Sequence, residues 1–102
     1  MMIRLRPEAE AAYRKHHNAV WPSVLHTITS CNIHNYSIFL RDDCLFGYFE
    51  YTGPDYEADM RRMAADPETQ RWWGIMEPMQ EPLENRATGE WWASMEEVFH
   101  HD

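Results

Sequence analysis

Basic residues and long hydrophobic runs are both scarce in this chain. Its 102 residues include nine Lys or Arg against 17 Asp or Glu, which gives a formal net charge of −8 at pH 7. Nucleic acid or an anionic membrane would repel such a chain. No apolar run approaches the roughly 20 residues of a membrane span, and the first residues lack the apolar segment of a signal peptide. We therefore expect a cytoplasmic protein that binds neither nucleic acid nor membrane.

Cysteine is scarce as well. The two cysteines, Cys31 and Cys44, are too few for a disulfide scaffold. They flank an expected hairpin turn at Asp42 and Asp43, which puts Cys44 opposite a residue near Arg41 and Cys31 far along the other strand. We expect two free thiols that the activity does not need.

The common cofactor motifs are also missing. The six histidines show no metal-ligand spacing such as His-Glu-x-x-His, and the cysteines form no Cys-x-x-Cys pair. No phosphate-binding loop, dinucleotide glycine pattern or Gly-x-Ser-x-Gly turn is present. The sequence therefore predicts neither a metal nor a cofactor, and it excludes the commonest nucleotide and hydrolase sites.

Aromatic residues, in contrast, are abundant. Five Trp, five Tyr and four Phe occur in a chain that is 44% hydrophobic and 25% charged. The length predicts one domain over residues 1–102, small enough that a partner subunit would help to bury apolar surface. Indole rings suit the apolar faces of sugars. A small neutral ligand fits this composition better than a charged one.

Hydrophobic periodicity predicts the order strand, helix, strand, strand, helix, strand. The expected strands are 2–6, 33–40, 44–51 and 91–99, and the expected helices are 7–29, disturbed near Pro22, and 56–77, interrupted near Pro67. Residues 77–89 are expected to be a loop. In the second strand, Tyr36 and Leu40 fall on one side and Ile33 on the other. With right-handed crossovers this is an α+β fold, a ferredoxin-like βαββαβ antiparallel sheet with both helices on one face. We expect the uncovered face to form a homodimer.

Tyr13 and His17 are the first candidates for chemistry. Residues four apart share one face of a helix with about 3.6 residues per turn. The same face continues in a run of apolar side chains, namely Val20, Trp21, Val24, Leu25 and Ile28. A phenol and an imidazole thus stand where the pattern expects core, which is typical of a pocket. The alternative is that both side chains only pack.

Trp72, Trp73 and Tyr36 are the other candidates. Consecutive helical residues point about 100° apart, so one indole can face inward while the next reaches a cleft. Tyr36 would add a hydroxyl from the neighbouring strand. For all three the alternative is packing in the core or a dimer interface. Trp91 and Trp92, on the last expected strand, are expected to be structural.

Four segments together resemble the L-rhamnose mutarotase family. They are Tyr13-x-x-x-His17-Asn18-x-x-Trp21-Pro22, His34-Asn35-Tyr36-Ser37-Ile38, Arg71-Trp72-Trp73 and Glu97-Val98-Phe99. They follow the family's order and spacing over nearly the whole chain. Two features depart from the family's pattern: the first strand begins a few residues later than usual, and the segment 74–90 follows its own course near the expected pocket.

The resemblance implies a dimeric α+β barrel that interconverts the α and β anomers of L-rhamnose, or a close 6-deoxy sugar, without a cofactor. It implies His17 as the proton donor and Tyr13, Tyr36, Trp72 and Trp73 as sugar-binding residues. Opening a pyranose needs one proton delivered to the ring oxygen and another removed from the anomeric hydroxyl, and an imidazole can do either near neutral pH. Two other readings stay open: a cofactorless monooxygenase or haem-handling protein of the same barrel type, and a sugar-binding module without catalysis.

Overall fold

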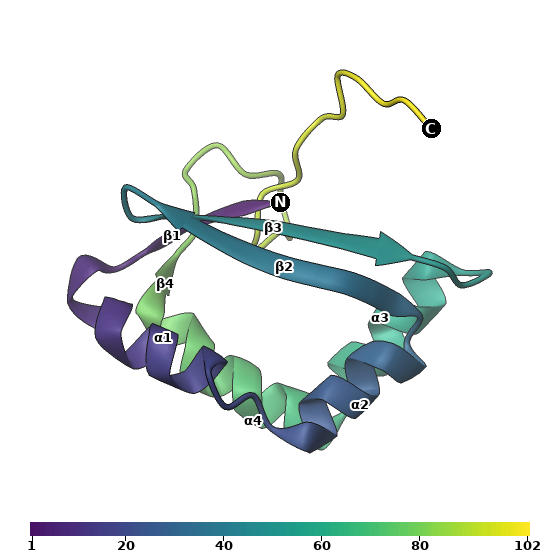
Figure 1. Ribbon diagram of the computed structural model, residues 1–102, viewed down its shortest axis with the longest axis horizontal. Coiled ribbons are helices and arrows are strands. Elements are labelled where there is room, and N and C mark those ends of the chain that lie inside the picture. Colours follow the sequence, from purple (N-terminus) through teal and green to yellow (C-terminus); the bar gives the residue numbers. More distant parts are fainter.

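The computed structural model describes all 102 residues, and it consists of an antiparallel sheet with its helices on one face (Figure 1). The strands are β1 (Met2–Leu5), β2 (Ile33–Arg41), β3 (Cys44–Tyr51) and β4 (Gln80–Glu81). The helices are α1 (Glu10–His17), α2 (Pro22–Ser30), α3 (Tyr56–Ala64) and α4 (Pro67–Met76), with short 3-10 turns at Pro7–Ala9 and Glu77–Met79.

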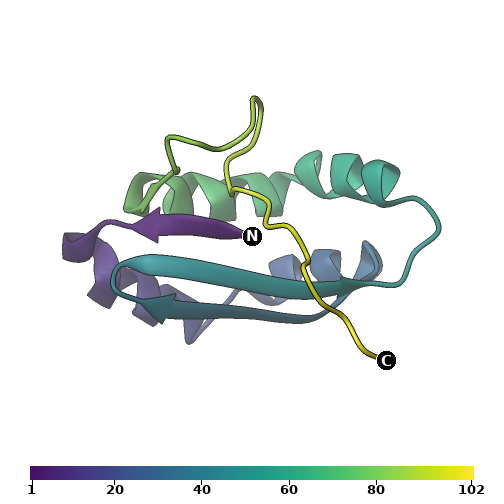
Figure 2. The same cartoon turned by 90° about the horizontal axis from the view of Figure 1, so that it is seen from above.

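The strand order is β2-β3-β1-β4, with every pair antiparallel. The expected four-stranded antiparallel sheet and the α+β class are therefore confirmed. Seen from above, α1 and α2 lie along one side of the helix layer and α3 and α4 along the other (Figure 2). None of these helices combines the length and the apolar character needed to cross a membrane.

Pro22 divides the first helical segment as expected. The residue before a proline is forced out of the helical region, and Trp21 is accordingly extended, with φ −59° and ψ 132°. Helix α1 therefore ends at His17, and α2 restarts with Pro22 in its first turn, where a missing N–H costs nothing. The break lets the two helices follow different directions beneath the sheet.

The second helical segment is divided in the same way. The Asp66 carboxylate accepts hydrogen bonds from the Thr69 amide at 2.9 Å and from its hydroxyl at 2.8 Å, and Pro67 occupies the first turn. Asp66 is thus the N-cap of α4. Asp55 caps α3 by accepting from the amide of Ala58 at 3.1 Å.

The hairpin between β2 and β3 turns where the sequence predicts. Asp42 and Asp43 both have positive φ, 50° and 60°, as in the tight turns whose twist matches paired strands. Arg41 pairs with Cys44, and both cysteines are free. The expectation that both thiols are free is confirmed.

A bulge interrupts β2 beside the helix layer. The register shifts between His34 and Ser37, so that Asn35 and Tyr36 together face one residue of β3, Phe49. Asn35 adopts the left-handed conformation, with φ 47°. Asparagine tolerates this region better than most residues because its short amide can bond locally. A bulge of this kind redirects the side chains that follow it.

The bulge corrects the expected alternation of β2. Ile33 pairs with Tyr51 and Leu40 with Leu45, and Leu45 and Tyr51 share a face of β3 because they are an even number of residues apart. Ile33 and Leu40 therefore lie on the same face, and their predicted separation is wrong. The grouping of Tyr36 with Leu40 is confirmed, because the Tyr36 ring contacts Phe49, which shares a face of β3 with Leu45, the partner of Leu40.

The fourth strand is not the segment that was predicted. The edge of β1 is taken by Gln80–Glu81, directly after the helical turn, and in the predicted strand 91–99 only Ala93 bridges to Met2. Two residues are too few to show an alternating pattern, so the sequence predicts a loop there. The tail beyond Ala93 extends on the side of the sheet opposite the helices, with Val98 and Phe99 exposed (Figures 1 and 2).

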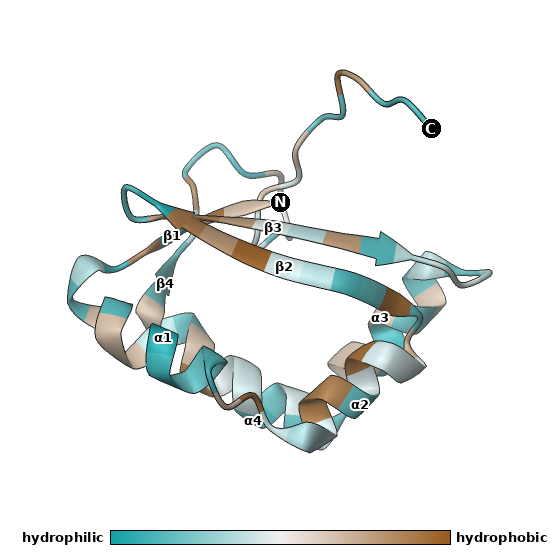
Figure 3. Ribbon diagram, viewed as in Figure 1, coloured by the Kyte–Doolittle hydropathy of each residue, from teal (hydrophilic) through white to brown (hydrophobic).

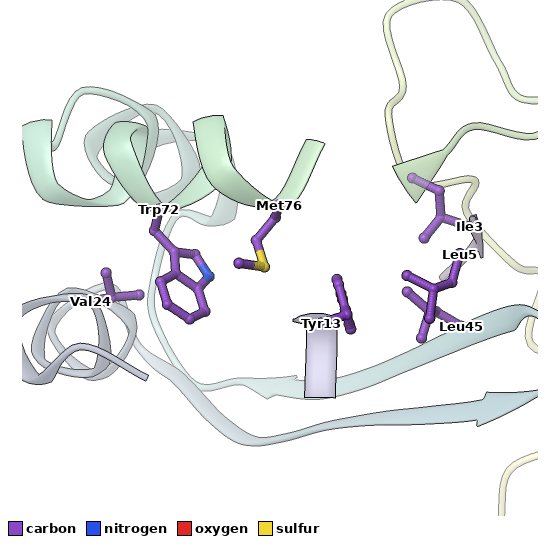
Figure 4. Packing of buried hydrophobic residues seen from close by; sticks show 7 residues of the cluster. All are labelled: Ile3, Leu5, Tyr13, Val24, Leu45, Trp72 and Met76. Atoms are coloured by element: carbon purple, nitrogen blue, oxygen red, sulfur yellow. The ribbon is translucent and has the colours of Figure 1, made fainter. Parts of the chain in front are cut away.

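The core lies between the sheet and the helices. Hydrophobic colouring concentrates on α2 and on part of β2 (Figure 3). Seven buried side chains form one cluster, in which Trp72 reaches from α4 toward Val24 of α2 (Figure 4). Its members are Ile3, Leu5, Tyr13, Val24, Leu45, Trp72 and Met76. Tyr13, a candidate for chemistry, is therefore part of the core.

The left-handed residue of the bulge generates a prediction about stability. Asn35→Val should destabilise the protein by about 1–2 kcal/mol relative to Asn35→Gly, because a β-branched side chain is strained at positive φ and glycine is not. Both variants lose the same exposed hydrogen bond from Asn35 to Glu50, so their difference isolates the backbone. Urea denaturation measures this difference in the free energy of unfolding. Equal stabilities of the two variants would contradict the left-handed conformation of Asn35 in the bulge.

Candidate active site

The five candidate residues line one cavity. Its volume is about 770 Å³, and its walls come mainly from α1, α2, α4 and β2. Ligand pockets for small molecules typically measure about 300–1,000 Å³, so a monosaccharide fits. The predicted residues among its lining are Tyr13, His17, Tyr36, Trp72 and Trp73. The structure therefore brings together side chains from three separate parts of the chain.

His17 is held by its own helix. Its Nδ1 lies 2.8 Å from the backbone carbonyl of Tyr13. A carbonyl can only accept, so Nδ1 carries the proton and Nε2 is the nitrogen left for a ligand. The Tyr13 and His17 rings stack, with centroids 4.2 Å apart. The predicted shared face is confirmed, and the imidazole is fixed in both tautomer and orientation.

The two adjacent tryptophans have different surroundings. Trp72 is 6% exposed and meets His17 and Trp21 edge to face, with centroids 5.6 and 5.3 Å apart. Trp73 is 37% exposed and lines the cavity without an aromatic partner. One indole therefore packs inward while its neighbour stays accessible, as the 100° step of a helix predicts.

Tyr36 reaches the cavity from the sheet. Its ring contacts Phe49 edge to face, with centroids 5.5 Å apart. Burial of the hydroxyl, together with the neighbouring phenols of Tyr13 and Tyr56, raises the pKa of Tyr36 far above its ordinary value. Tyr36 is 39% exposed, and it lines the cavity. Tyr36 thus offers a permanently protonated hydroxyl.

The cavity also shifts the pKa values of the Tyr13 and His17 pair. Burial lowers the pKa of His17, the backbone hydrogen bond to Tyr13 opposes this, and the nearby charge of His16 lowers it further. Burial raises the pKa of Tyr13, and a hydrogen bond from Gln80 partly offsets the increase. A histidine whose pKa is lowered is a stronger acid when protonated.

Gln80 was not anticipated. It is 4% exposed, and it joins Tyr13 to Trp91 by hydrogen bonds of 3.1 and 2.8 Å. It lies in a segment predicted to be a loop, where no periodicity could reveal that it is buried. Trp92 packs against the core cluster, and Trp91 bonds to Gln80.

The rest of the molecule offers no competing site with the candidate residues. A second cavity, of about 540 Å³, is lined by Met2, Arg4 and residues 81–85, and it contains none of the candidate residues. No group of three or more His, Cys, Asp and Glu side chains is arranged to hold a metal ion. The cavity around His17 is therefore the candidate active site.

Comparison with known proteins assigns the family. A family model described as L-rhamnose mutarotase matches residues 1–101. The chain belongs to the L-rhamnose mutarotase family. It is 34% identical over 103 residues to an L-rhamnose mutarotase of Oceanobacillus iheyensis, covering 99% of this chain and 94% of the relative. It is also 36% identical over 95 residues to one of Opitutus terrae, covering 91% and 86%.

A crystal structure supports the same fold. The L-rhamnose mutarotase FA22100 from Formosa agariphila matches with a TM-score of 0.73 and 20% identity, over 99% of this chain and 94% of that chain. The α+β arrangement of this mutarotase-family chain is thus found in a solved structure.

The contrast between the two indoles predicts different costs of truncation. Trp72→Ala should destabilise the protein by about 3–5 kcal/mol, because it leaves a cavity in the core. Trp73→Ala, the matched control, should cost much less, because its side chain is accessible. Chemical denaturation measures both changes, and similar losses would show that the two residues are packed alike.

Proposed function

We propose that this protein interconverts the α and β anomers of L-rhamnose, or of a close 6-deoxy sugar, with His17 as the proton donor. The observation that carries the proposal is the convergence of His17, Tyr36 and the indole pair on one sugar-sized cavity. Family membership supports the same activity. A largely hydrophobic lining with few polar groups suits a sugar whose C5 carries a methyl group.

The reaction needs only proton transfers. Protonated Nε2 of His17 gives its proton to the ring oxygen while a base takes the anomeric proton; the bond between C1 and the ring oxygen breaks, and an aldehyde forms. Rotation about the C1–C2 bond presents the other face of the aldehyde, and the reverse transfers close the ring. Hydrogen bonding of Nδ1 to Tyr13 keeps the reacting nitrogen fixed. General acid–base help of this kind typically gives about 10²- to 10⁴-fold.

The remaining side chains position the sugar. Tyr13 and Tyr36 offer hydroxyls whose raised pKa values keep them protonated, so they can donate to sugar oxygens. Trp73 presents an accessible indole to an apolar face of the ring, and Trp72 forms the wall beside His17. Orientation matters because ring opening requires the proton to reach one particular oxygen.

We also propose that the protein is a homodimer in which the uncovered sheet faces pack together as an α+β barrel. Tyr48 is 54% exposed, and it lies three residues from the buried Leu45 on β3, so its side chain points to the sheet face that no helix covers. Burying such side chains between sheets is favourable. Tyr48→Glu should shift the protein toward monomer in sedimentation equilibrium, whereas Thr29→Glu, on the helical side, should not. A monomeric wild-type protein would contradict the proposal.

His17→Ala should remove enzyme-dependent exchange between the anomers. We expect exchange to slow by about 10²- to 10⁴-fold, which is the rate enhancement that general acid–base catalysis typically gives. Saturation-transfer NMR on L-rhamnose measures the exchange directly. The matched control is His26→Ala, because His26 is an exposed histidine on α2 that does not line the cavity. Unchanged exchange in a folded His17→Ala protein would remove the proposed role.

The pH dependence separates an acid from a base. If His17 acts as the acid, exchange corrected for the spontaneous rate falls as pH rises through the pKa of His17, because the imidazolium disappears. Burial lowers that pKa, so the fall should lie below the ordinary histidine value of about 6.5. Exchange that instead rises over this range would reassign His17 as the base.

A further inference from the structure

The buried amide of Gln80 links Tyr13 to a tryptophan far along the chain. Gln80 begins β4, pairs with Leu5 and is 4% exposed. Its Nε2 lies 3.1 Å from the Tyr13 hydroxyl, and its Oε1 lies 2.8 Å from Nε1 of Trp91. The loop after β4 therefore brings Trp91 within hydrogen-bond distance of Gln80, which in turn bonds to the Tyr13 hydroxyl.

The direction of these two hydrogen bonds is fixed by chemistry. An indole nitrogen can only donate, so the group of Gln80 that faces Trp91 must be its carbonyl oxygen. The amide nitrogen must then face Tyr13, and since it can only donate, the phenol oxygen accepts. Trp91 thus determines which way the Gln80 amide is turned, and Gln80 determines the role of the Tyr13 oxygen.

The proton of the Tyr13 hydroxyl is consequently left for a ligand. Tyr13 forms no hydrogen bond through its hydroxyl other than the one it accepts from Gln80, and its side chain lines the cavity beside His17. We propose that Gln80 and Trp91 are positioning residues that make Tyr13 a hydrogen-bond donor to an oxygen of the bound sugar. This inference rests on the proposed mutarotase function and adds two residues that do not line the cavity themselves.

Gln80→Glu tests the direction of the hydrogen bond with almost no change in shape. A carboxylate at position 80 accepts from Trp91 as before, but it also accepts from Tyr13, so the phenol proton turns away from the sugar. We expect anomer exchange to fall by about tenfold, the value of one hydrogen bond of about 1.4 kcal/mol. Gln70→Glu makes the same substitution at an exposed position of α4 and should leave exchange unchanged.

Two readouts separate this role from general damage. The Gln80→Glu loss should shrink at low pH, because a protonated carboxyl can donate to Tyr13 as the amide does. The loss should also vanish in a Tyr13→Phe background, because no phenol proton is then left to misdirect. If Gln80→Glu does not fold, Trp91→Phe replaces it: freeing the amide to turn should lower exchange several-fold, again only when Tyr13 is intact.

The results of these experiments separate a failure of the inference from a failure of the proposed function. Wild-type protein without anomer exchange overturns the proposed function and the inference together. Active wild-type protein, with Gln80→Glu equal to Gln70→Glu, overturns the inference alone. If Gln80→Glu lowers exchange equally in the Tyr13 and Tyr13→Phe backgrounds, that result overturns the inference as well, because it shows that position 80 acts through packing.

Discussion

The packing of Trp72 is the contact on which the rest of the structure depends. This buried indole extends from α4 toward Val24 on α2, and it meets the edge of His17 at the end of α1 (Figure 4). A buried side chain of this size contributes several kcal/mol, and its aromatic contacts add direction. One residue therefore holds three helices together and also forms the cavity wall. The hydrophobic core and the candidate active site therefore share this residue.

Two interruptions of regular structure complete the site. Pro22 ends the first helical segment early, so His17 stands at a helix end rather than inside a long rod. The bulge at Asn35 adds one residue to β2 and places Tyr36 beside Phe49 on the cavity side. Each irregularity weakens local hydrogen bonding, and the surrounding core stabilises it. His17 and Tyr36 of the cavity come from these two positions.

Much of this arrangement could be predicted from the sequence, because periodicity and turn residues are local signals. The face shared by Tyr13 and His17, the break at Pro22 and the turn at Asp42 and Asp43 follow from spacing and backbone chemistry alone. The resemblance to the family also predicts that Tyr13 and His17 lie in one site with Trp72.

Other features depend on contacts that no local pattern records. Simple alternation along β2 predicts Ile33 on the face opposite to Leu40. The bulge places both on the same face, because pairing with β3 sets the register. The edge of β1 is filled by Gln80–Glu81 rather than by residues 91–99, because the chain leaving α4 already lies there. The bond of Gln80 to Tyr13 spans 67 residues of sequence. Such a bond becomes visible only when the fold brings the two side chains together.

A crystal structure with bound L-rhamnose would show whether His17 faces the ring oxygen of the sugar. We predict the pyranose between Tyr36 and the indole of Trp73, with its ring oxygen within hydrogen-bond distance of Nε2 of His17. A sugar bound instead beside residues 81–85, or a ring oxygen out of reach of that nitrogen, would contradict this prediction.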